Sequence, residues 1–290
     1  MSFPASATEL ELQARLSELL AAGSLEISPR ELHQAKAVAA LLPSDTCVYI
    51  PSLPGLPLGR TLEAVAALRA AGLDPVPHVS ARRIADRDEF SEFLKAAVRQ
   101  HGVHRVLLIG GDEPRPKGPY GDSLQVLEEG MLADCGVREI GVGGYPEGHP
   151  RIPPAVLQES LKKKLALARG QSLGVYVVTQ FSFAPQRVVE YCAGLARSHP
   201  ELPVYVGIAG PTDPVALARY AQRCGVSVSL RALRNLGTGI ARLVTHTDPR
   251  EHVVAMARYA RSREPSNVVG VHLYSFGGAE RTAAWMRELI

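Results

Sequence analysis

The chain has 290 residues, of which 46% are hydrophobic and 21% charged, proportions typical of a globular protein with a full core. The formal net charge is only +3 and Lys and Arg are scattered, so nucleic acid is not an expected partner. No run of about 18 apolar residues occurs, so we expect no membrane span and no membrane partner.

Cysteine usage and the N-terminal pattern both favour a cytoplasmic protein. The cysteines are Cys47, Cys135, Cys192 and Cys224, which lie far apart and form no C-x-x-C pair. This spacing argues against a disulfide framework or a zinc knuckle and for a reducing compartment. Residues 1–23 have the pattern of an amphipathic helix with acidic residues, which is unlike a signal peptide.

Short apolar runs alternate with helical patterns along nearly the whole chain. Most of these runs are continuously apolar rather than alternating with polar residues, as a parallel sheet buried on both faces requires. We expect eight strands, at 24–28, 47–51, 75–79, 105–110, 139–144, 175–181, 203–209 and 267–275.

The segments between these strands carry helix start and stop signals. The helix predicted at 60–72 closes on a glycine, the residue most suited to a helix C-terminus. The helix predicted at 122–136 opens with an aspartate and has Gln125 three residues later, as in a capping box. The helix predicted at 212–225 begins with a threonine and places Pro214 in its first turn.

Eight strand–helix units predict a closed (β/α)8 TIM barrel with an extra N-terminal helix. Residues 226–250 contain no clear strand, and we expect an additional helical excursion there. No Pro/Ser-rich linker interrupts the chain, which favours a single barrel domain over 1–290. A doubly wound open sheet is the alternative, but it would need a G-x-G-x-x-G turn, which "GVGGYPEG" at 141–148 does not match.

Polar side chains occur at six of the eight predicted strand ends. In (β/α)8 barrels these ends form the face that carries the chemistry. Glu26 and Gln180 interrupt otherwise apolar strands, where a buried polar group is costly unless it is satisfied or used. The residues at this predicted face are Glu26, His78, Asp112, Tyr145, Glu147, His149, Gln180 and Tyr274.

A metal-dependent hydrolase is the competing interpretation of a barrel mouth with histidines. Glu147 and His149 supply two ligand types, but no third ligand of matching spacing accompanies them. No serine lies in a G-x-S-x-G turn either. We therefore expect neither a bound metal nor a serine nucleophile.

Five motifs, in this order and spacing, resemble those of the methylenetetrahydrofolate reductase family. "SLEISPRE" at 24–31 is also similar to that family's strand-one motif. The resemblance covers the chain from Ser24 onward and is most specific in the combination of Y-P-E-x-H-P with T-Q-F. The motifs are "LLIGGDEP" (107–114), "GVGGYPEGHP" (141–150), "VVTQFSF" (177–183), "GIAGP" (207–211) and "VHLYSFGGAE" (271–280).

The resemblance implies a (β/α)8 barrel that holds FAD and interconverts 5,10-methylenetetrahydrofolate and 5-methyltetrahydrofolate by hydride transfer, with NADH or NADPH as co-substrate. It assigns Glu26 as the general acid that opens the methylene bridge to an iminium. Asp112 matches the acid that faces flavin and pterin, and Gln180 the residue between flavin and substrate. We also expect Phe181 and Tyr274 to contact the substrate.

The resemblance also implies the residues that hold FAD. The glycines would let the backbone approach a flat cofactor closely, and the polar side chains would contact the cofactor. These residues are His78, Gly110, Gly111, Asp112, Tyr120, Gly143, Tyr145, His149 and Lys164.

Three departures from the family pattern leave other functions open. Strand two is followed by the proline-rich "PSLPGLPLGR" (51–60), His78 is followed by "VS" (79–80), and "FGG" (276–278) stands where an arginine is usual. The alternatives are a folate- or flavin-binding barrel without reductase activity and a flavin-free reductase that passes hydride directly from NADH to folate. The sequence leaves open the physiological direction and whether the chain forms a homo-oligomer.

Overall fold

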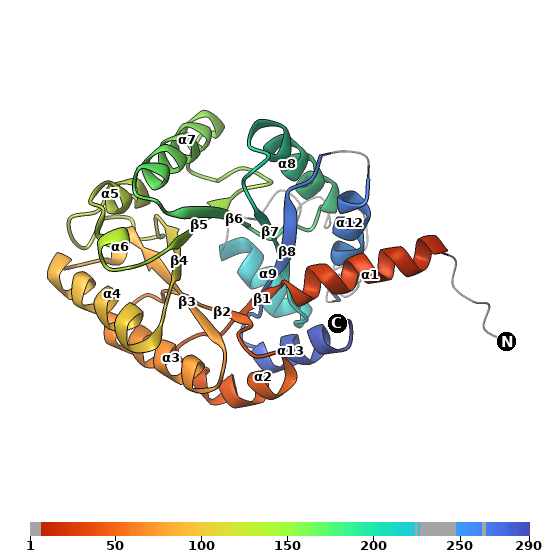
Figure 1. Ribbon diagram of the computed structural model, residues 1–290, viewed down its shortest axis with the longest axis horizontal. Helices are drawn as coiled ribbons and strands as arrows, with labels where there is room; N and C mark the ends of the chain where they lie inside the picture. Colours follow the sequence, from red (N-terminus) through yellow and green to blue (C-terminus); the bar gives the residue numbers. More distant parts are fainter. Residues whose placement is uncertain (1–6, 224–225, 227–247, 263–264) are drawn as a thin grey trace. The chain divides into compact units, whose positions relative to one another are not determined.

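The computed structural model describes residues 7–223, 226, 248–262 and 265–290. The strands pair in chain order into a closed barrel, which confirms the predicted (β/α)8 fold (Figure 1). The predicted excursion at 226–250 and the end of the 212–225 helix lie mostly outside the described residues. The strands are β1 (Ser24–Glu26), β2 (Cys47–Ile50), β3 (Asp74–Ser80), β4 (Arg105–Ile109), β5 (Glu139–Gly144), β6 (Gly174–Thr179), β7 (Val204–Ala209) and β8 (Val268–Tyr274).

Helices separate the strands along the chain, and the predicted N-terminal helix is present as α1. Among the described residues, no helix combines the length and apolar character that crossing a bilayer requires. The helices are α1 (Ala7–Ala21), α2 (Ala35–Leu41), α3 (Leu58–Ala70), α4 (Arg87–His101), α5 (Ser123–Glu128), α6 (Met131–Asp134), α7 (Pro154–Gly170), α8 (Pro185–Ser198), α9 (Pro214–Arg223), α12 (Arg250–Ala260) and α13 (Ala279–Arg287), with short 3-10 turns η1 (Leu32–Gln34) and η2 (Ala81–Arg83).

Helix ends follow the sequence signals, with one difference. The Asp122 side chain caps α5 by accepting hydrogen bonds from the N–H groups of Leu124 and Gln125. Gly72 follows the C-cap of α3 and has a φ of +85°, the left-handed conformation in which many helices end. The single helix predicted at 122–136 is wrong, because Gly130 adopts a φ of +75° and divides it into α5 and α6.

Inter-residue contacts divide the chain into two compact units. The first comprises Met1–Leu25, Tyr145–Glu147 and Val178–Ile290, and the second comprises Glu26–Gly144 and Gly148–Val177. The expectation of a single domain stays a prediction.

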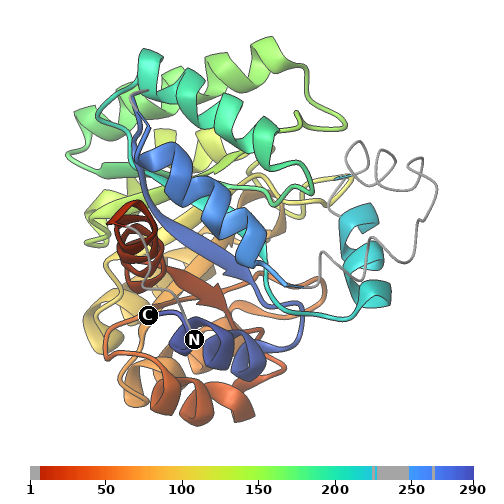
Figure 2. The same ribbon diagram turned by 90° about the vertical axis from the view of Figure 1, so that its right-hand side faces the viewer.

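In the first unit, α1 packs against β8 and α12 (Figure 2). The same view shows the β8 arrow pointing toward the side on which α9 lies. β7 and β8 are parallel, with Gly207 opposite His272 and Ala209 opposite Tyr274. The strand ends of this unit therefore present β6, β7 and β8 residues toward the α9 side.

In the second unit, α3 and α4 cover the outer face of β2, β3 and β4 (Figure 1). β2 pairs with β3, β3 with β4, and β4 with β5, all in parallel. Val48, Tyr49 and Ile50 of β2, whose side chains point alternately to the two faces, are all at most 2% exposed, and Val106, Leu107 and Leu108 of β4 are all at most 6% exposed. Continuous apolar strands thus became strands buried on both faces, as their composition predicts.

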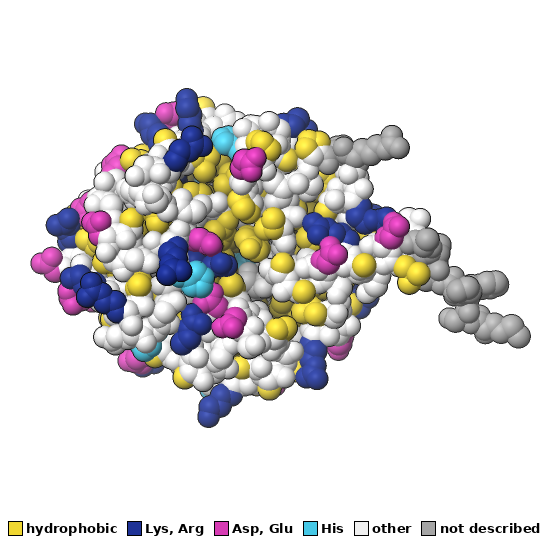
Figure 3. All heavy atoms as spheres, viewed as in Figure 1, with side chains coloured by type: hydrophobic (Ala, Val, Ile, Leu, Met, Phe, Trp, Pro, Cys, Tyr) yellow, Lys and Arg dark blue, Asp and Glu magenta, His cyan; other side chains and the backbone are white. Residues whose placement is uncertain are grey.

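Charged side chains gather where the strands of the second unit begin. Figure 3 shows both signs of charge over β3 and β4. Asp74, the first residue of β3, accepts a hydrogen bond from Arg69 at 2.5 Å, and Arg105 of β4 pairs with Glu139 of β5 at 3.0 Å. The first pair ties the start of β3 to α3, and the second ties the start of β4 to that of β5. Both lie at the face associated with barrel stability, at the opposite ends of the strands from the predicted site.

Candidate active site

A carboxyl and an imidazole meet at the strand ends of the second unit. Glu26 is the last residue of β1, and His78 lies two residues before the end of β3. Glu26 Oε1 is 3.6 Å from His78 Nε2, and the two side chains are only 16% and 9% exposed. Both side chains are largely buried, and they bring together two kinds of group that exchange protons readily.

Two tyrosines form the floor beneath this pair. The Tyr49 ring meets the His78 ring edge-on, with centroids 5.9 Å apart. The Tyr49 hydroxyl donates to the Tyr176 hydroxyl at 3.0 Å, and the Arg105 guanidinium lies 5.9 Å from the Tyr176 ring centroid. Burial raises the pKa of both phenols, so both stay protonated at neutral pH. The floor thus consists of two neutral phenols that are hydrogen-bonded to each other.

The β4 end supplies an open stretch of backbone. Gly111 has a φ of +89°, and a Cβ there would lie 3.3 Å from the Ser80 Cβ, so glycine is strongly favoured at this position. A Cβ at Gly110 would meet nothing within 4 Å, so this backbone has free space beside it. Asp112, which follows, is exposed and pairs with Arg151 at 3.6 Å.

His149 lies in the loop after β5, close to this acid–arginine pair. Its Nδ1 accepts the Arg151 N–H at 3.2 Å, and His149 forms a β-bridge with Ile152. Burial, and then the Arg151 charge, lower the pKa of His149, which favours the neutral imidazole. The structure thus brings Asp112 and His149 together through Arg151, a residue that the sequence prediction missed.

Tyr120 and Lys164 have local partners of their own in the second unit. The buried Tyr120 hydroxyl donates to Glu129 at 2.5 Å, and burial together with this hydrogen bond raises the pKa of Tyr120 to about 12. Lys164 lies on α7, where burial lowers the pKa of its ammonium group against the opposing effect of Asp122. Gly143 lies within β5 and is half-buried.

In the first unit, strand six ends earlier than the sequence predicts. β6 stops at Thr179, so Gln180 and Phe181 begin the following loop rather than ending the strand at 181. The Gln180 Oε1 accepts the Phe181 N–H at 3.0 Å, which leaves the amide nitrogen of Gln180 as a donor. The Tyr274 hydroxyl donates to the Thr179 carbonyl at 3.0 Å, so the ends of β6 and β8 are joined.

Phe181 is 1% exposed and belongs to an aromatic cluster that the sequence prediction did not assemble. Its ring centroid lies 5.6 Å from that of Tyr274 and 5.3 Å from that of Phe276. Phe276 also stacks on Tyr220 at 4.5 Å, and it adopts a φ of +48°, which is strained for a bulky residue. The "FGG" departure after β8 was the only sequence signal for this arrangement.

Tyr145 and Glu147 belong to the first unit and are half-buried. Tyr191 of α8 hydrogen-bonds to the Tyr145 backbone, and burial raises the pKa of Tyr191. The residues that follow β5 are thus anchored by a helix that the sequence reasoning did not connect with them.

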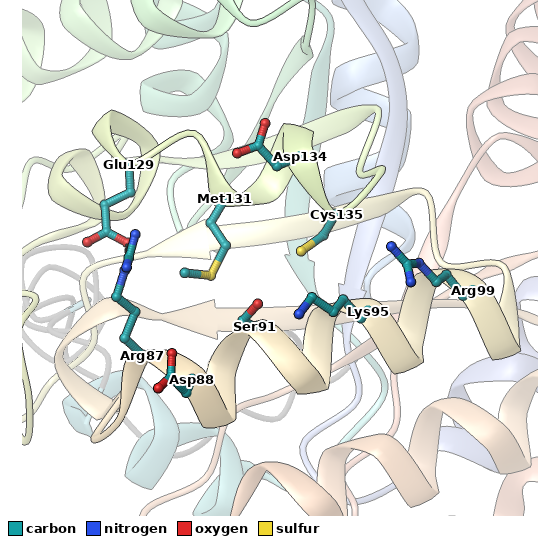
Figure 4. Close-up of a pocket in the computed structure, with 9 residues that line it drawn as sticks. All are labelled: Arg87, Asp88, Ser91, Lys95, Arg99, Glu129, Met131, Asp134 and Cys135. Atoms are coloured by element: carbon teal, nitrogen blue, oxygen red, sulfur yellow. Dashed lines mark hydrogen bonds and ion pairs between the residues drawn. The ribbon is translucent and has the colours of Figure 1, made fainter.

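Two of the cavities in the described part of the second unit bear on the location of a site. One, of about 240 Å³, lies between α4 and the α5–α6 segment, with Arg87, Ser91 and Lys95 on one side and Glu129 and Cys135 on the other (Figure 4). Burial raises the pKa of the Cys135 thiol, so it is a poor nucleophile, and none of the predicted site residues lines this cavity. The other, of about 310 Å³, lies beneath the proline-rich segment after β2 and is lined in part by His78.

Within the described part of the chain, no group of three or more His, Cys, Asp and Glu side chains could hold a metal ion. Cys47, Cys135 and Cys192 are free thiols. Burial raises the pKa of Cys47 to about 11, which makes it an unreactive thiol at neutral pH.

Comparison with known proteins gives weak homology and a clear fold match. No protein-family model matches the chain. A 137-residue segment is 25% identical to methylenetetrahydrofolate reductase 2 of Saccharomyces cerevisiae; it covers 44% of this chain but only 22% of the yeast protein. A solved Clostridium thermocellum protein, which binds two copies of 5-methyl-5,6,7,8-tetrahydrofolic acid, matches 98% of this chain and 100% of its own with a TM-score of 0.61 at 10% identity.

The fold and strand-end residues together define a (β/α)8 barrel whose polar groups lie where such barrels carry out chemistry. The sequence comparison adds that the chain is weakly homologous to a yeast methylenetetrahydrofolate reductase.

Proposed function

We propose that the protein is a flavin-dependent oxidoreductase that interconverts 5,10-methylenetetrahydrofolate and 5-methyltetrahydrofolate. The observation that carries the proposal is the half-buried Glu26–His78 pair at the ends of β1 and β3. A general acid at this position matches the role that the resemblance assigns to Glu26. The weak homology to the yeast reductase supports the same reaction class.

The residues of the second unit fit a bound FAD. The open space beside Gly110 allows its backbone to approach a flat or anionic group. Arg151 and Lys164 supply positive charge suited to a pyrophosphate, and His149 supplies a neutral imidazole. Bound there, FAD would supply the hydride acceptor and donor, and NADH or NADPH would be the source of electrons.

Glu26 and His78 would handle the proton in the folate half-reaction. Glu26 gives its proton to a bridging nitrogen of the substrate, which opens the ring to an iminium that can accept hydride. His78, 3.6 Å away, returns a proton to Glu26 after a small approach of the two side chains. The apolar tyrosine floor limits access of water to the reacting carbon.

Gln180, in the first unit, is a further residue that we propose for substrate binding. Because its Oε1 is engaged with the Phe181 N–H, its amide nitrogen is presented as a donor to an acceptor on the folate ring. The aromatic cluster around Phe181 and Tyr274 holds the start of this loop in one conformation.

The absorption spectrum of the purified protein tests the cofactor. We expect flavin bands that bleach when NADH or NADPH is added without oxygen. A protein that is colourless and does not take up added FAD would contradict the flavin, and direct hydride transfer from NADH to folate in that protein would support a flavin-free reductase instead.

A further inference from the structure

A cavity lies beneath the proline-rich segment that follows β2; it shares His78 with the proposed reaction and otherwise lies in a part of the second unit that this reaction does not use. The segment 52–58 covers it, and η2, α4 and the end of β3 form its walls. Its volume of about 310 Å³ is at the lower limit for pockets that bind small molecules, too small for a folate or a flavin nucleotide. We call it the loop cavity.

Apolar side chains form about half of the walls of the loop cavity. Leu53 and Leu56 come from the covering segment, Ile84 follows η2, and Phe90 and Phe93 come from the first turns of α4. Phe90, Phe93 and Ile84 are otherwise buried, so their rings and methyl groups form a fixed surface. Such a surface favours a compact aromatic or branched apolar group.

A buried hydroxyl lines the same cavity. Ser80, at the end of β3, is 4% exposed, and its Oγ has no hydrogen-bond partner among the described residues. A buried hydroxyl without a hydrogen-bond partner costs folding free energy, so it indicates a position where a ligand oxygen would supply the missing hydrogen bond. A Cβ at position 111 would lie 3.3 Å from the Ser80 Cβ, so there is little free space on that side of Ser80.

Charged side chains of both signs line the loop cavity, and one of its two cations has no ion-pair partner among the described residues. Its lining includes two cations, Arg83 and Lys117, and one anion, Glu89. Arg83 is already paired with Glu113 at 3.1 Å. Lys117 forms no ion pair with any described residue, and its backbone N–H donates to the Arg82 carbonyl, which ties its chain segment to η2. Lys117 is therefore the cation available to a ligand.

We propose that the loop cavity binds a small organic monoanion, namely a carboxylate on a compact aromatic or branched apolar body. The carboxylate lies toward Lys117 and the Ser80 hydroxyl, and the apolar body lies against Phe90 and Phe93. This inference does not depend on the proposed reductase function.

Benzoate is a suitable probe, and benzyl alcohol is its uncharged counterpart. We expect benzoate to cause saturable chemical-shift changes in the amides of 52–58 and Ser80 of the ¹⁵N-labelled full chain, with a dissociation constant in the roughly millimolar range. Benzyl alcohol should bind at least about tenfold more weakly, because it cannot form the charged contact with Lys117.

Three variants locate the site. Lys117→Met should weaken benzoate binding about tenfold and Ser80→Ala about threefold, whereas Lys162→Met, an exposed lysine on α7, should leave it unchanged. The proposal is overturned if benzoate gives no saturable change or shifts amides elsewhere. It is equally overturned if benzyl alcohol binds as well, or if Lys117→Met and Ser80→Ala bind benzoate like the unmodified chain.

Discussion

Glu26→Gln separates the chemical role of Glu26 from its structural role. Glutamine has nearly the same shape as glutamate, so packing at the end of β1 is preserved. The Glu26–His78 distance of 3.6 Å is longer than a direct hydrogen bond, so the substitution should lower the free energy of unfolding by about 1 kcal/mol or less.

The chemical effect should be much larger. A positioned general acid contributes about 10²- to 10⁴-fold, which corresponds to roughly 2.7 to 5.4 kcal/mol of activation free energy. The folate half-reaction should slow by that factor, while reduction of the flavin by NADH should change less than about threefold, because that step needs no proton from Glu26.

Anaerobic stopped-flow absorbance measures the two half-reactions separately. Glu159→Gln is the control, since Glu159 is an exposed carboxyl on α7 that has no role in the proposed chemistry. If Glu26→Gln retained the rate of the folate half-reaction, or slowed both half-reactions equally, the assignment of Glu26 as general acid would be refuted.

Three further predictions concern the scaffold. Gly111→Ala should lower the free energy of unfolding, measured in urea, by about 1–2 kcal/mol, because of the φ of +89° and because the new Cβ would lie 3.3 Å from the Ser80 Cβ. Gly110→Ala should change the free energy of unfolding by less than about 0.5 kcal/mol and should instead reduce FAD occupancy. Equal effects of the two variants on stability would contradict the geometry. Asp122→Ala should cost about 1 kcal/mol through loss of the α5 cap and Asp122→Asn far less, and similar losses in both would show that the cap contributes little. Burial raises the pKa of Cys47 from 9.0 to about 11, so the folded state keeps the thiol protonated where the unfolded chain ionises, and this contribution to stability is complete below pH 9 and declines up to pH 11. Between pH 8 and pH 10 the free energy of unfolding of the unmodified chain should therefore fall by about 1.4 kcal/mol more than that of Cys47→Ser. Parallel pH profiles of the two proteins would refute the raised pKa.

Much of the barrel could be predicted from local sequence. Apolar runs such as those of β2 and β4 have no polar alternation, so a sheet buried on both faces was the consistent solution. Asp122 and Gly72 were recognisable because capping chemistry depends on one residue type in one backbone conformation. The break at Gly130 was missed, because a glycine within a helical pattern is often tolerated.

The candidate site was predictable only residue by residue. Glu26 and His78 were each notable at a strand end, but their 3.6 Å approach depends on β1 and β3 belonging to one barrel, which is a property of the fold. The resemblance suggested FAD contacts for Tyr120, yet its hydroxyl is engaged by Glu129, and no local pattern announces that pairing. Arg151 was missed because an exposed arginine in a loop has no distinctive sequence signal.

The central claim is that this barrel passes hydride between a flavin and a one-carbon folate. The most direct measurement is the absorbance of the purified protein, reduced with NADH in the absence of oxygen, on mixing with 5,10-methylenetetrahydrofolate. The proposed function predicts return of the oxidised flavin bands together with stoichiometric formation of 5-methyltetrahydrofolate. Flavin bands that stay bleached after mixing, with the folate recovered unchanged, would contradict it.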